Sequence, residues 1–463
     1  MLTNTTKRRG YAPRLRAVLF GAALLVPAVG CGDILEVDDP DVTSRDLLTT
    51  PEAVPALRAG ALGDFTTGYE QLINLGGMLG DEFFFSETFP TRRVVDERNI
   101  DPNNSNLLTL FAQVATANAA PEFSARRIAE IQAAFPAVTG LNDDRAEGLN
   151  LSSLAKVLFA EHYCEGVPLS RLEIQGQSLD FQYGNPLTRT QMLDSAIAGF
   201  DQARTAVGAS TAAADVNQRN LAVVGRARAM MNKGDFAGLL AFLTANPVPL
   251  TYTFQLQHSA NSAGENNQVW NFNTLNERIS VSDREGTNGL PYRAARAGQP
   301  GGRDPRVLWI RTPANDVGFD GTTPQFDALK YPDRPAFTVI ASGVETRLMA
   351  AEAQLNAGNA QAMLDSLNNL RAQVQPLMQL LNFDYVTQQQ KVGYAPGQSA
   401  TLAPLTLPAT AAERRDLLFA ERAYWLSFTA HRLGDMRRLI RQYGLTQAQV
   451  FPVGPYHKGG VYG

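Results

Sequence analysis

The chain has 463 residues, of which 44% are hydrophobic and 19% charged, a composition typical of a folded globular protein with a large core. Residues 1–30 hold five of its lysines and arginines and no acid, so the remainder carries 36 Lys and Arg against 45 Asp and Glu, a net charge of −9. This balance argues against nucleic acid as a partner, because phosphate binding needs a basic face.

Residues 1–30 have the layout of a signal peptide. A basic stretch precedes an apolar run from Ala17 to Val29, and small residues stand just before Cys31. The run is shorter than the roughly 20 residues of a membrane-spanning helix. The end of the leader resembles a lipobox, with Ala28 where Leu or Val is commoner, so we expect Cys31 to be acylated and to attach the chain to a membrane through lipid alone. The alternative is an ordinary cleaved leader.

Residues 31–49 follow as an acidic segment, which predicts a tether between the lipid and the domain or, equally, a plain solvated terminus. The second cysteine, Cys164, cannot form an internal disulfide once Cys31 is acylated. We therefore expect Cys164 to be a small buried apolar residue.

Helical signals dominate residues 50–245. Thr50, Pro51 and Glu52 form a helix start, with a capping hydroxyl, a proline in the first turn and an acid at the positive dipole end. Thr188 with Gln191, and later Thr410 with Glu413, have the spacing of capping boxes, and apolar residues at helical spacing follow each.

One internal repeat indicates paired helices. Residues 227–236 align with residues 351–360, with Ala, Ala, Asn and Gly at matching positions. Small alanines allow close helix packing, and the glycine ends the first helix in a left-handed cap. This pattern predicts helix–turn–helix units of the tetratricopeptide kind, and copies about 124 residues apart require other units or an insertion between them.

Residues 246–339 form that insertion. They are rich in Gly, Pro, Asn and Asp, contain short β-like pieces, and carry Trp270, Trp309, Tyr292 and Tyr331. A long irregular stretch of this kind is usually functional. A further loop is expected at residues 382–408.

Enzyme signatures are weak in this chain. None of the four histidines has metal-ligand spacing, and the sequence has neither a nucleophile elbow nor a phosphate-binding loop. We therefore predict no catalytic residues, no metal and no cofactor. Chance acidic pairs are common among 45 acids, so a hydrolase stays as a distant alternative.

A motif near the C-terminus resembles the signature of the SusD/RagB family, roughly E-R-x-x-E-L-x-F-E-G-x-R-x-x-D-L-x-R. The chain keeps the residues Glu421, Arg422, Leu426, Phe428, Arg432, Asp435 and Arg438. It departs at Trp425 and Thr429, where the family has Glu, and at Ala430, where it has Gly. Weaker family-like segments occur in family order, among them residues 110–118, 159–169, 188–203, 347–371 and 451–454.

The resemblance implies a mainly α fold, in which tetratricopeptide-like helix pairs form a scaffold and a long loop-rich insertion with short β-strands carries the ligand. On this basis residues 50–463 are one SusD-like domain, with scaffold at about 50–245 and 340–463 and insertion at about 246–339. It also implies an outer-membrane lipoprotein, facing the exterior, that binds a nutrient oligomer and delivers it to a SusC-like TonB-dependent transporter. The alternative is a tetratricopeptide-type scaffold lipoprotein that binds protein partners in the cell envelope.

Ligand residues are predicted from chemistry alone. Sugar rings stack on aromatic side chains, and their hydroxyls bond to amides, carboxylates and arginine. The candidates are Trp270, Asn271, Asn273, Tyr292, Arg293, Tyr331, Asp81 and Glu82, for a glycan, glycopeptide or peptide. A buried structural role is the rival interpretation for each, and Phe83–Phe85 are expected in the core. Glu421, Arg432, Asp435 and Arg438 are expected on one helix, in salt bridges that pack helix pairs.

Overall fold

The computed structural model describes residues 48–175, 178–294, 296, 298–313 and 316–463. The predicted signal peptide, Cys31 and most of the tether lie outside the described residues. The described part is mainly helical, as predicted, with short two-stranded sheets.

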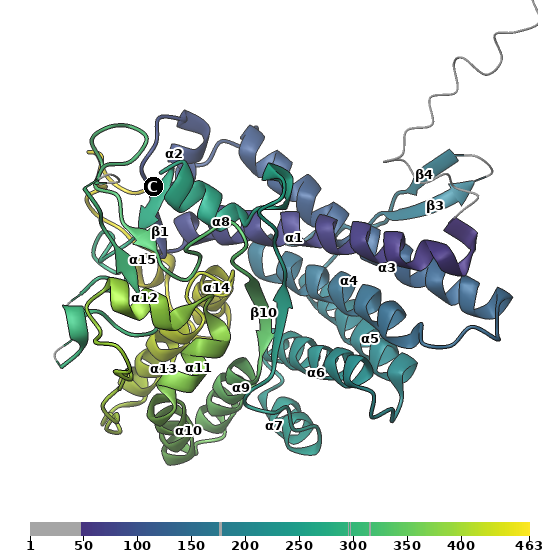
Figure 1. Ribbon diagram of the computed structural model, residues 1–463. Helices are drawn as coiled ribbons and strands as arrows, with labels where there is room; N and C mark the ends of the chain where they lie inside the picture. The colour runs from purple at the N-terminus through teal and green to yellow at the C-terminus, as the bar shows by residue number, and fades with distance from the viewer. Residues whose placement is uncertain (1–47, 176–177, 295, 297, 314–315) are drawn as a thin grey trace, which may run out of the picture. The chain divides into compact units, whose positions relative to one another are not determined.

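Long antiparallel helices form the first half of the described chain, and successive helices pack against one another (Figure 1). They are α1 (Val54–Leu79), α2 (Pro90–Asp96), α3 (Ser105–Ala134), α4 (Asn142–His162), α5 (Arg189–Val207), α6 (Ala213–Lys233) and α7 (Phe236–Ala245). A 3-10 turn at Pro51–Ala53 leads into α1, and the capping boxes at Thr188 and Thr410 are both confirmed.

Glycine sets how closely two of these helices approach. A Cβ atom at Gly148 of α4 would lie 2.7 Å from the carbonyl oxygen of Pro121 in α3. Any larger side chain would push the helices apart, so the interior of the helix stack depends on backbone-to-backbone contact at this point.

The predicted repeat is confirmed as two helix–turn–helix units. In the first unit, α6 ends at Gly234, which has φ of 78°, and α7 follows. In the second unit, α9 (Gly343–Asn356) is followed by Gly358, which has φ of 82°, and then by α10 (Ala360–Ala372). The left-handed conformation that glycine adopts at low cost turns the chain between the two helices of each unit.

Short elements occupy the stretch between α7 and α9. The helical turns are Ala263–Glu265 (η3), α8 (Gln268–Trp270), a π-helix at Asn271–Leu275 (η4) and Pro300–Gly302 (η5). The strands are β6 (Thr253–Leu256), β7 (Ile279–Val281), β8 (Trp309–Ile310), β9 (Asp327–Ala328) and β10 (Thr338–Ser342). Antiparallel pairing joins β7 to β1 (Phe83–Phe85), and β6 to β10 next to α9, so the loop region is fixed to the helices at both ends.

Two further small sheets connect α4 to α5. Their strands are β2 (Val167–Pro168), β3 (Arg171–Gln175), β4 (Ser178–Gln182) and β5 (Pro186–Leu187). Cys164 lies at the start of this connection and is exposed, so the expectation that it is buried was wrong. The residue follows the end of α4, where the chain leaves the core.

The last helices are α11 (Val374–Leu381), α12 (Tyr385–Lys391), α13 (Ala411–Trp425), α14 (Arg432–Tyr443) and α15 (Gln447–Val450). Helix α12 lies within the stretch that was predicted as a loop. The single helix expected across the C-terminal motif is also wrong, because α13 and α14 are separated by a turn in which Phe428 and Ala430 both have φ of 57°. Ala430 stands where the family pattern has Gly, the residue best suited to this conformation.

A single large hydrophobic cluster connects α1, α4 and α6 with the loop region, and Phe83 and Phe85 lie within it as predicted. Within the described ranges, no helix combines the length and apolar character needed to cross a bilayer.

Candidate functional site

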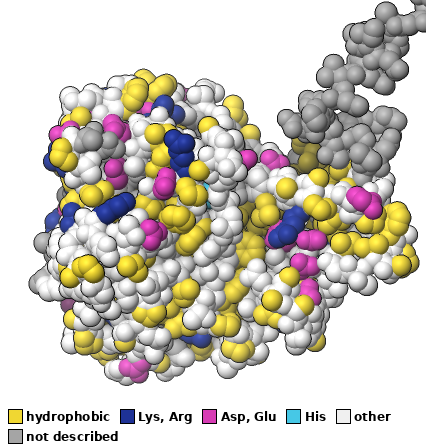
Figure 2. All heavy atoms as spheres, viewed as in Figure 1, with side chains coloured by type: hydrophobic (Ala, Val, Ile, Leu, Met, Phe, Trp, Pro, Cys, Tyr) yellow, Lys and Arg dark blue, Asp and Glu magenta, His cyan; other side chains and the backbone are white. Residues whose placement is uncertain are grey.

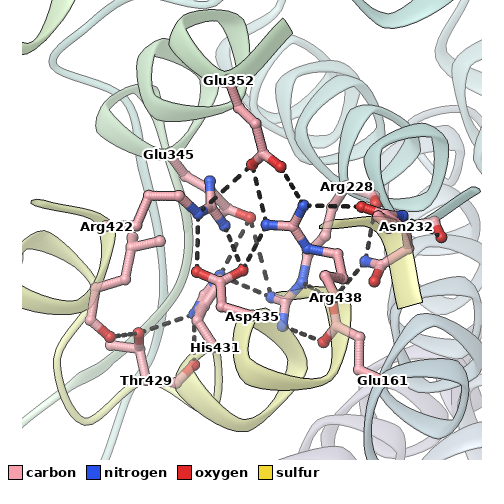
Figure 3. Close-up of polar contacts among 12 residues, drawn as sticks. Glu161, Arg228, Asn232, Glu345, Glu352, Arg422, Thr429, His431, Asp435 and Arg438 are labelled. Atoms are coloured by element: carbon pink, nitrogen blue, oxygen red, sulfur yellow. Dashed lines mark hydrogen bonds and ion pairs between the residues drawn. The ribbon is translucent and has the colours of Figure 1, made fainter. Parts of the chain in front are cut away.

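The charged residues of the C-terminal motif are buried in an ion-pair network (Figure 3). Arg438 bonds both Glu352 of α9, at 3.0 Å, and Asp435, at 2.7 Å, while Arg422 bonds Asp435 at 2.8 Å. Burial raises the pKa of Asp435, but the charges of Arg422 and Arg438 outweigh this effect and hold the pKa well below its usual range. These residues pack helices together, as predicted.

The same network reaches into the first half of the chain. Arg228 of α6 forms a bidentate bond with Glu161 of α4, at 2.8 and 2.6 Å, and lies 2.8 Å from the ring of His431 (Figure 3). His431 in turn lies 3.1 Å from Glu345 of α9. Residues from the five helices α4, α6, α9, α13 and α14, and from the turn before α14, therefore share one buried cluster of compensated charges.

Asp81 and Glu82, two predicted ligand residues, are buried beside this turn. Asp81 accepts two bonds from Arg432, at 2.6 and 2.8 Å, and Glu82 accepts the amide of Phe428 at 2.7 Å. Burial raises the pKa of Glu82 to about 8, against the opposing effect of the Phe428 hydrogen bond. Their contacts hold the C-terminal turn against the end of α1, and a part in ligand binding stays a prediction.

Trp270, Asn273 and Tyr331 are also buried. Asn273 donates to the carbonyl of Ile279 at 2.7 Å and accepts the amide of Ala328 at 2.6 Å, so it joins the π-helix to β7 and β9. The hydroxyl of Tyr331 donates to the carbonyl of Phe428 at 2.8 Å. These buried groups hold the segments of the loop region in place. This is the structural role that was the alternative prediction for each of them.

The remaining predicted residues differ in exposure. Tyr292 is buried and its ring packs edge-on against Tyr424. Asn271 is half-buried and donates to Gln268, three residues earlier in the chain, at 3.0 Å. Arg293 is half-buried and lines a cavity. Of the predicted set, Arg293 is thus the residue that the structure places on a cavity wall next to aromatic rings.

An exposed platform of apolar side chains surrounds Arg278 on the loop region. Phe89 is 45% exposed and Phe319 is 53% exposed, although large apolar side chains are usually covered. The guanidinium of Arg278 lies 5.3 Å from the ring centre of Phe89, 5.5 Å from that of Phe319 and 6.0 Å from that of Phe272. We call these residues, with Arg92, the aromatic platform.

The buried carboxylate of Glu87 holds two arginines of the platform in place. Glu87 accepts bonds from Arg92, at 2.7 Å, and from Arg278, at 3.2 Å. Arg92 in turn lies 4.6 Å from the ring centre of Phe89 and 5.5 Å from that of Phe272. The view in Figure 2 shows basic and hydrophobic side chains side by side over the region of α2 and α8. Alternating rings and guanidinium groups offer stacking faces and hydrogen-bond donors, the groups that recognise sugars.

A cavity of about 850 Å³ adjoins the platform. Phe319 belongs to the platform, and the next residue, Asp320, lines the cavity together with Phe84, Arg293, Phe326, Tyr456 and Lys458. This volume is within the usual range for small-molecule sites. Platform and cavity together form the candidate binding site, and Phe89, Phe319 and Lys458 are members that the sequence reasoning missed.

A second cavity of about 740 Å³ lies between α1 and β6. Its wall consists mainly of hydroxyls, amides and small side chains, with Glu70 and His258 paired at 2.9 Å. The aromatic ring in this wall, Phe254, is buried. It therefore lacks the exposed stacking faces of the aromatic platform. Among the described residues, no group of His, Cys, Asp and Glu has the arrangement of a metal site.

The sequence matches no protein-family model and no curated protein. Solved structures show similarity to the fold. A SusD-like carbohydrate binding protein from Bacteroides fragilis has a TM-score of 0.56 at 14% identity, and the match covers 86% of this chain and 87% of that chain.

Two other structures give the same result. A SusD-like carbohydrate binding protein from Bacteroides vulgatus has a TM-score of 0.52 at 12% identity, with 84% of this chain and 83% of that chain covered. Surface glycan-binding protein A from Bacteroides uniformis has a TM-score of 0.51 at 14% identity, with 86% and 90% covered. The chain therefore has the SusD-like fold that the C-terminal motif implied.

Proposed function

We propose that this protein binds an oligosaccharide on the aromatic platform and performs no catalysis itself. The observation that carries the proposal is the exposure of Phe89 and Phe319 around Arg278, whose guanidinium group is bonded to buried Glu87. Structural neighbours named for carbohydrate or glycan binding support the same chemistry. Sugar C–H faces would stack on the rings, and guanidinium groups would donate to hydroxyls.

Calorimetry tests this proposal directly. The chain without its signal peptide, carrying Cys31→Ala, is titrated with a panel of oligosaccharides. Replacing Phe89 and Phe319 together by Ala should weaken binding of the recognised glycan by at least tenfold, because both stacking faces are lost. Tyr183→Ala is the matched control, since Tyr183 is an exposed aromatic outside the platform. Equal affinity of the double variant and the control would contradict the proposal.

We further propose that the protein is a surface lipoprotein, acylated at Cys31, that passes its ligand to a TonB-dependent transporter. The leader sequence and the fold support this placement. In cells, Cys31→Ala should impair uptake of the glycan while the purified domain keeps its affinity. Uptake at the normal rate with the protein released from the membrane would contradict the anchoring role. Capture of an envelope protein, without glycan binding, would favour the scaffold alternative.

A further inference from the structure

Arg293 differs from the other cations that line the cavity beside the platform. Arg93 pairs with Glu97 at 2.7 Å, Arg284 pairs with Asp283 at 3.4 Å, and Lys458 pairs with Asp320. In the described part of the chain, the Arg293 side chain makes no hydrogen bond and no ion pair, and its Nε is buried without a partner. A half-buried guanidinium thus faces the cavity with its donors unused.

Aromatic packing holds this guanidinium in place. Its central carbon lies 3.7 Å from the ring centre of Phe326 and 5.8 Å from that of Phe84, and both rings line the cavity. The backbone amide of Arg293 donates to Asp283 at 2.8 Å, which fixes the start of the side chain. A stacked guanidinium presents its N–H edge in a fixed plane, the geometry that suits a carboxylate or sulfate.

An unpaired cation at this position is costly, because burial removes water from the charge. Burial lowers the pKa of Arg293, and Asp283 opposes this effect. Burial and the neighbouring Asp96 raise the pKa of Glu285 in the same wall, and Arg98 lies 3.3 Å from this carboxylate. The other acids of the wall, Asp283 and Asp320, pair with Arg284 and Lys458, so Arg293 is the cavity cation without a carboxylate partner among the described residues.

We propose that this cavity binds an anionic oxygen group, a carboxylate or a sulfate ester, carried by the sugar adjacent to the part stacked on the platform. The inference rests on the proposed function and names its substrate class: an acidic oligosaccharide. Arg293 forms the bidentate contact with this group.

Matched pairs of ligands test the substrate class. Oligogalacturonate is compared with its methyl ester, and a sulfated chondroitin oligosaccharide with its desulfated form, which keeps its carboxylates, by calorimetry at two salt concentrations. We expect at least a tenfold preference for the acidic member of one pair, reduced as salt rises. The pair that shows the preference identifies carboxylate or sulfate as the recognised group.

Variants then assign the preference to Arg293. Arg293→Gln should bring the two members of the pair to within about twofold, Arg293→Lys should retain part of the preference, and Arg171→Gln, at an exposed arginine outside the cavity, should leave it unchanged. Circular dichroism checks that each variant is folded. Glycan binding that depends on Phe89 and Phe319 but shows no acidic preference, or a preference that survives Arg293→Gln, overturns this inference and leaves the proposed function standing. Failure of every oligosaccharide, acidic or neutral, to bind overturns both.

Discussion

Arg228 and Arg438 of the helical scaffold differ in their surroundings from Arg278 and Arg293 of the loop region. Another arginine of the loop region, Arg306, is buried and paired with carboxylates as in the scaffold. In the scaffold, Arg228 and Arg438 are buried and bonded to carboxylates from other helices. In the loop region, Arg278 and Arg293 lie against aromatic rings at the surface or at a cavity, and Arg293 has no carboxylate partner among the described residues. The difference separates charges that hold the fold together from charges that remain available for a ligand.

The largest expected effect comes from breaking the scaffold network. Arg228→Met would leave Glu161 buried without its bidentate partner, and removal of one partner of a buried pair typically costs about 3–5 kcal/mol. The free energy of unfolding, measured in urea, should fall by that amount. Arg127→Met is the matched control, because its partner Glu130 is exposed and such pairs contribute about 0–1 kcal/mol. Equal losses in the two variants would refute the distinction.

The raised pKa of Glu82 predicts that the stability of the fold depends on pH. Its pKa is about 8 in the fold, against an ordinary value of 4.5, so the folded state keeps a proton that the unfolded chain loses. Stability from this group is therefore fully present below pH 4.5 and declines as pH rises toward 8, by at most about 1.4 kcal/mol per pH unit. Glu82→Gln keeps an acceptor for Phe428 and should flatten this decline. A parallel pH dependence of unfolding in the variant and the unmodified protein would show that Glu82 is not the group responsible.

Asn273→Ala tests the buried side of the loop region. Loss of its amide leaves the Ala328 amide without its partner and removes one of the donors to the carbonyls of Ile279 and Phe326, which should cost about 1–3 kcal/mol of unfolding free energy. Asn271→Ala removes only local bonds, to Gln268 before the π-helix and to Asn276 after it, and should cost less. If Asn273→Ala instead abolished glycan binding without changing stability, the original prediction of a ligand contact would stand.

The smallest effect on stability is expected at the platform. Phe319 is exposed, so Phe319→Ala should change the free energy of unfolding by no more than about 0.5 kcal/mol. By contrast, replacement of the buried Phe83 by Ala should lower the free energy of unfolding by about 3–5 kcal/mol. A large loss of stability from Phe319→Ala would mean that the platform supports the fold and is not reserved for binding.

Much of the scaffold could be predicted from local sequence. Capping boxes and glycine turns act over a few residues, so Thr188, Thr410, Gly234 and Gly358 each indicated the correct helix boundary. The break between α13 and α14 was missed because it depends on Glu82, more than 300 residues away, which bonds the amide of Phe428. Periodicity alone cannot distinguish two helices joined by such a turn from one continuous helix.

The site was harder to predict than the fold. Loop aromatics such as Trp270 and Tyr331 have the chemistry of ligand residues, but tertiary packing decides which rings face outward, and these two are buried. Phe272, close to Trp270 in the chain, contributes to the platform instead. Arg293 was predicted as a ligand residue from its chemistry, but its lack of a carboxylate partner could be established only from the folded chain.

Glu87 has a consequence for the rates of ligand exchange. Because its carboxylate already holds Arg92 and Arg278, the rings of the platform need no rearrangement when a ligand arrives. Association should therefore proceed without a slow conformational step, and differences in affinity among glycans should arise mainly from how fast each one leaves. A protein that captures a nutrient and then gives it up benefits from this arrangement, since release requires only loss of contacts on a surface that keeps its shape.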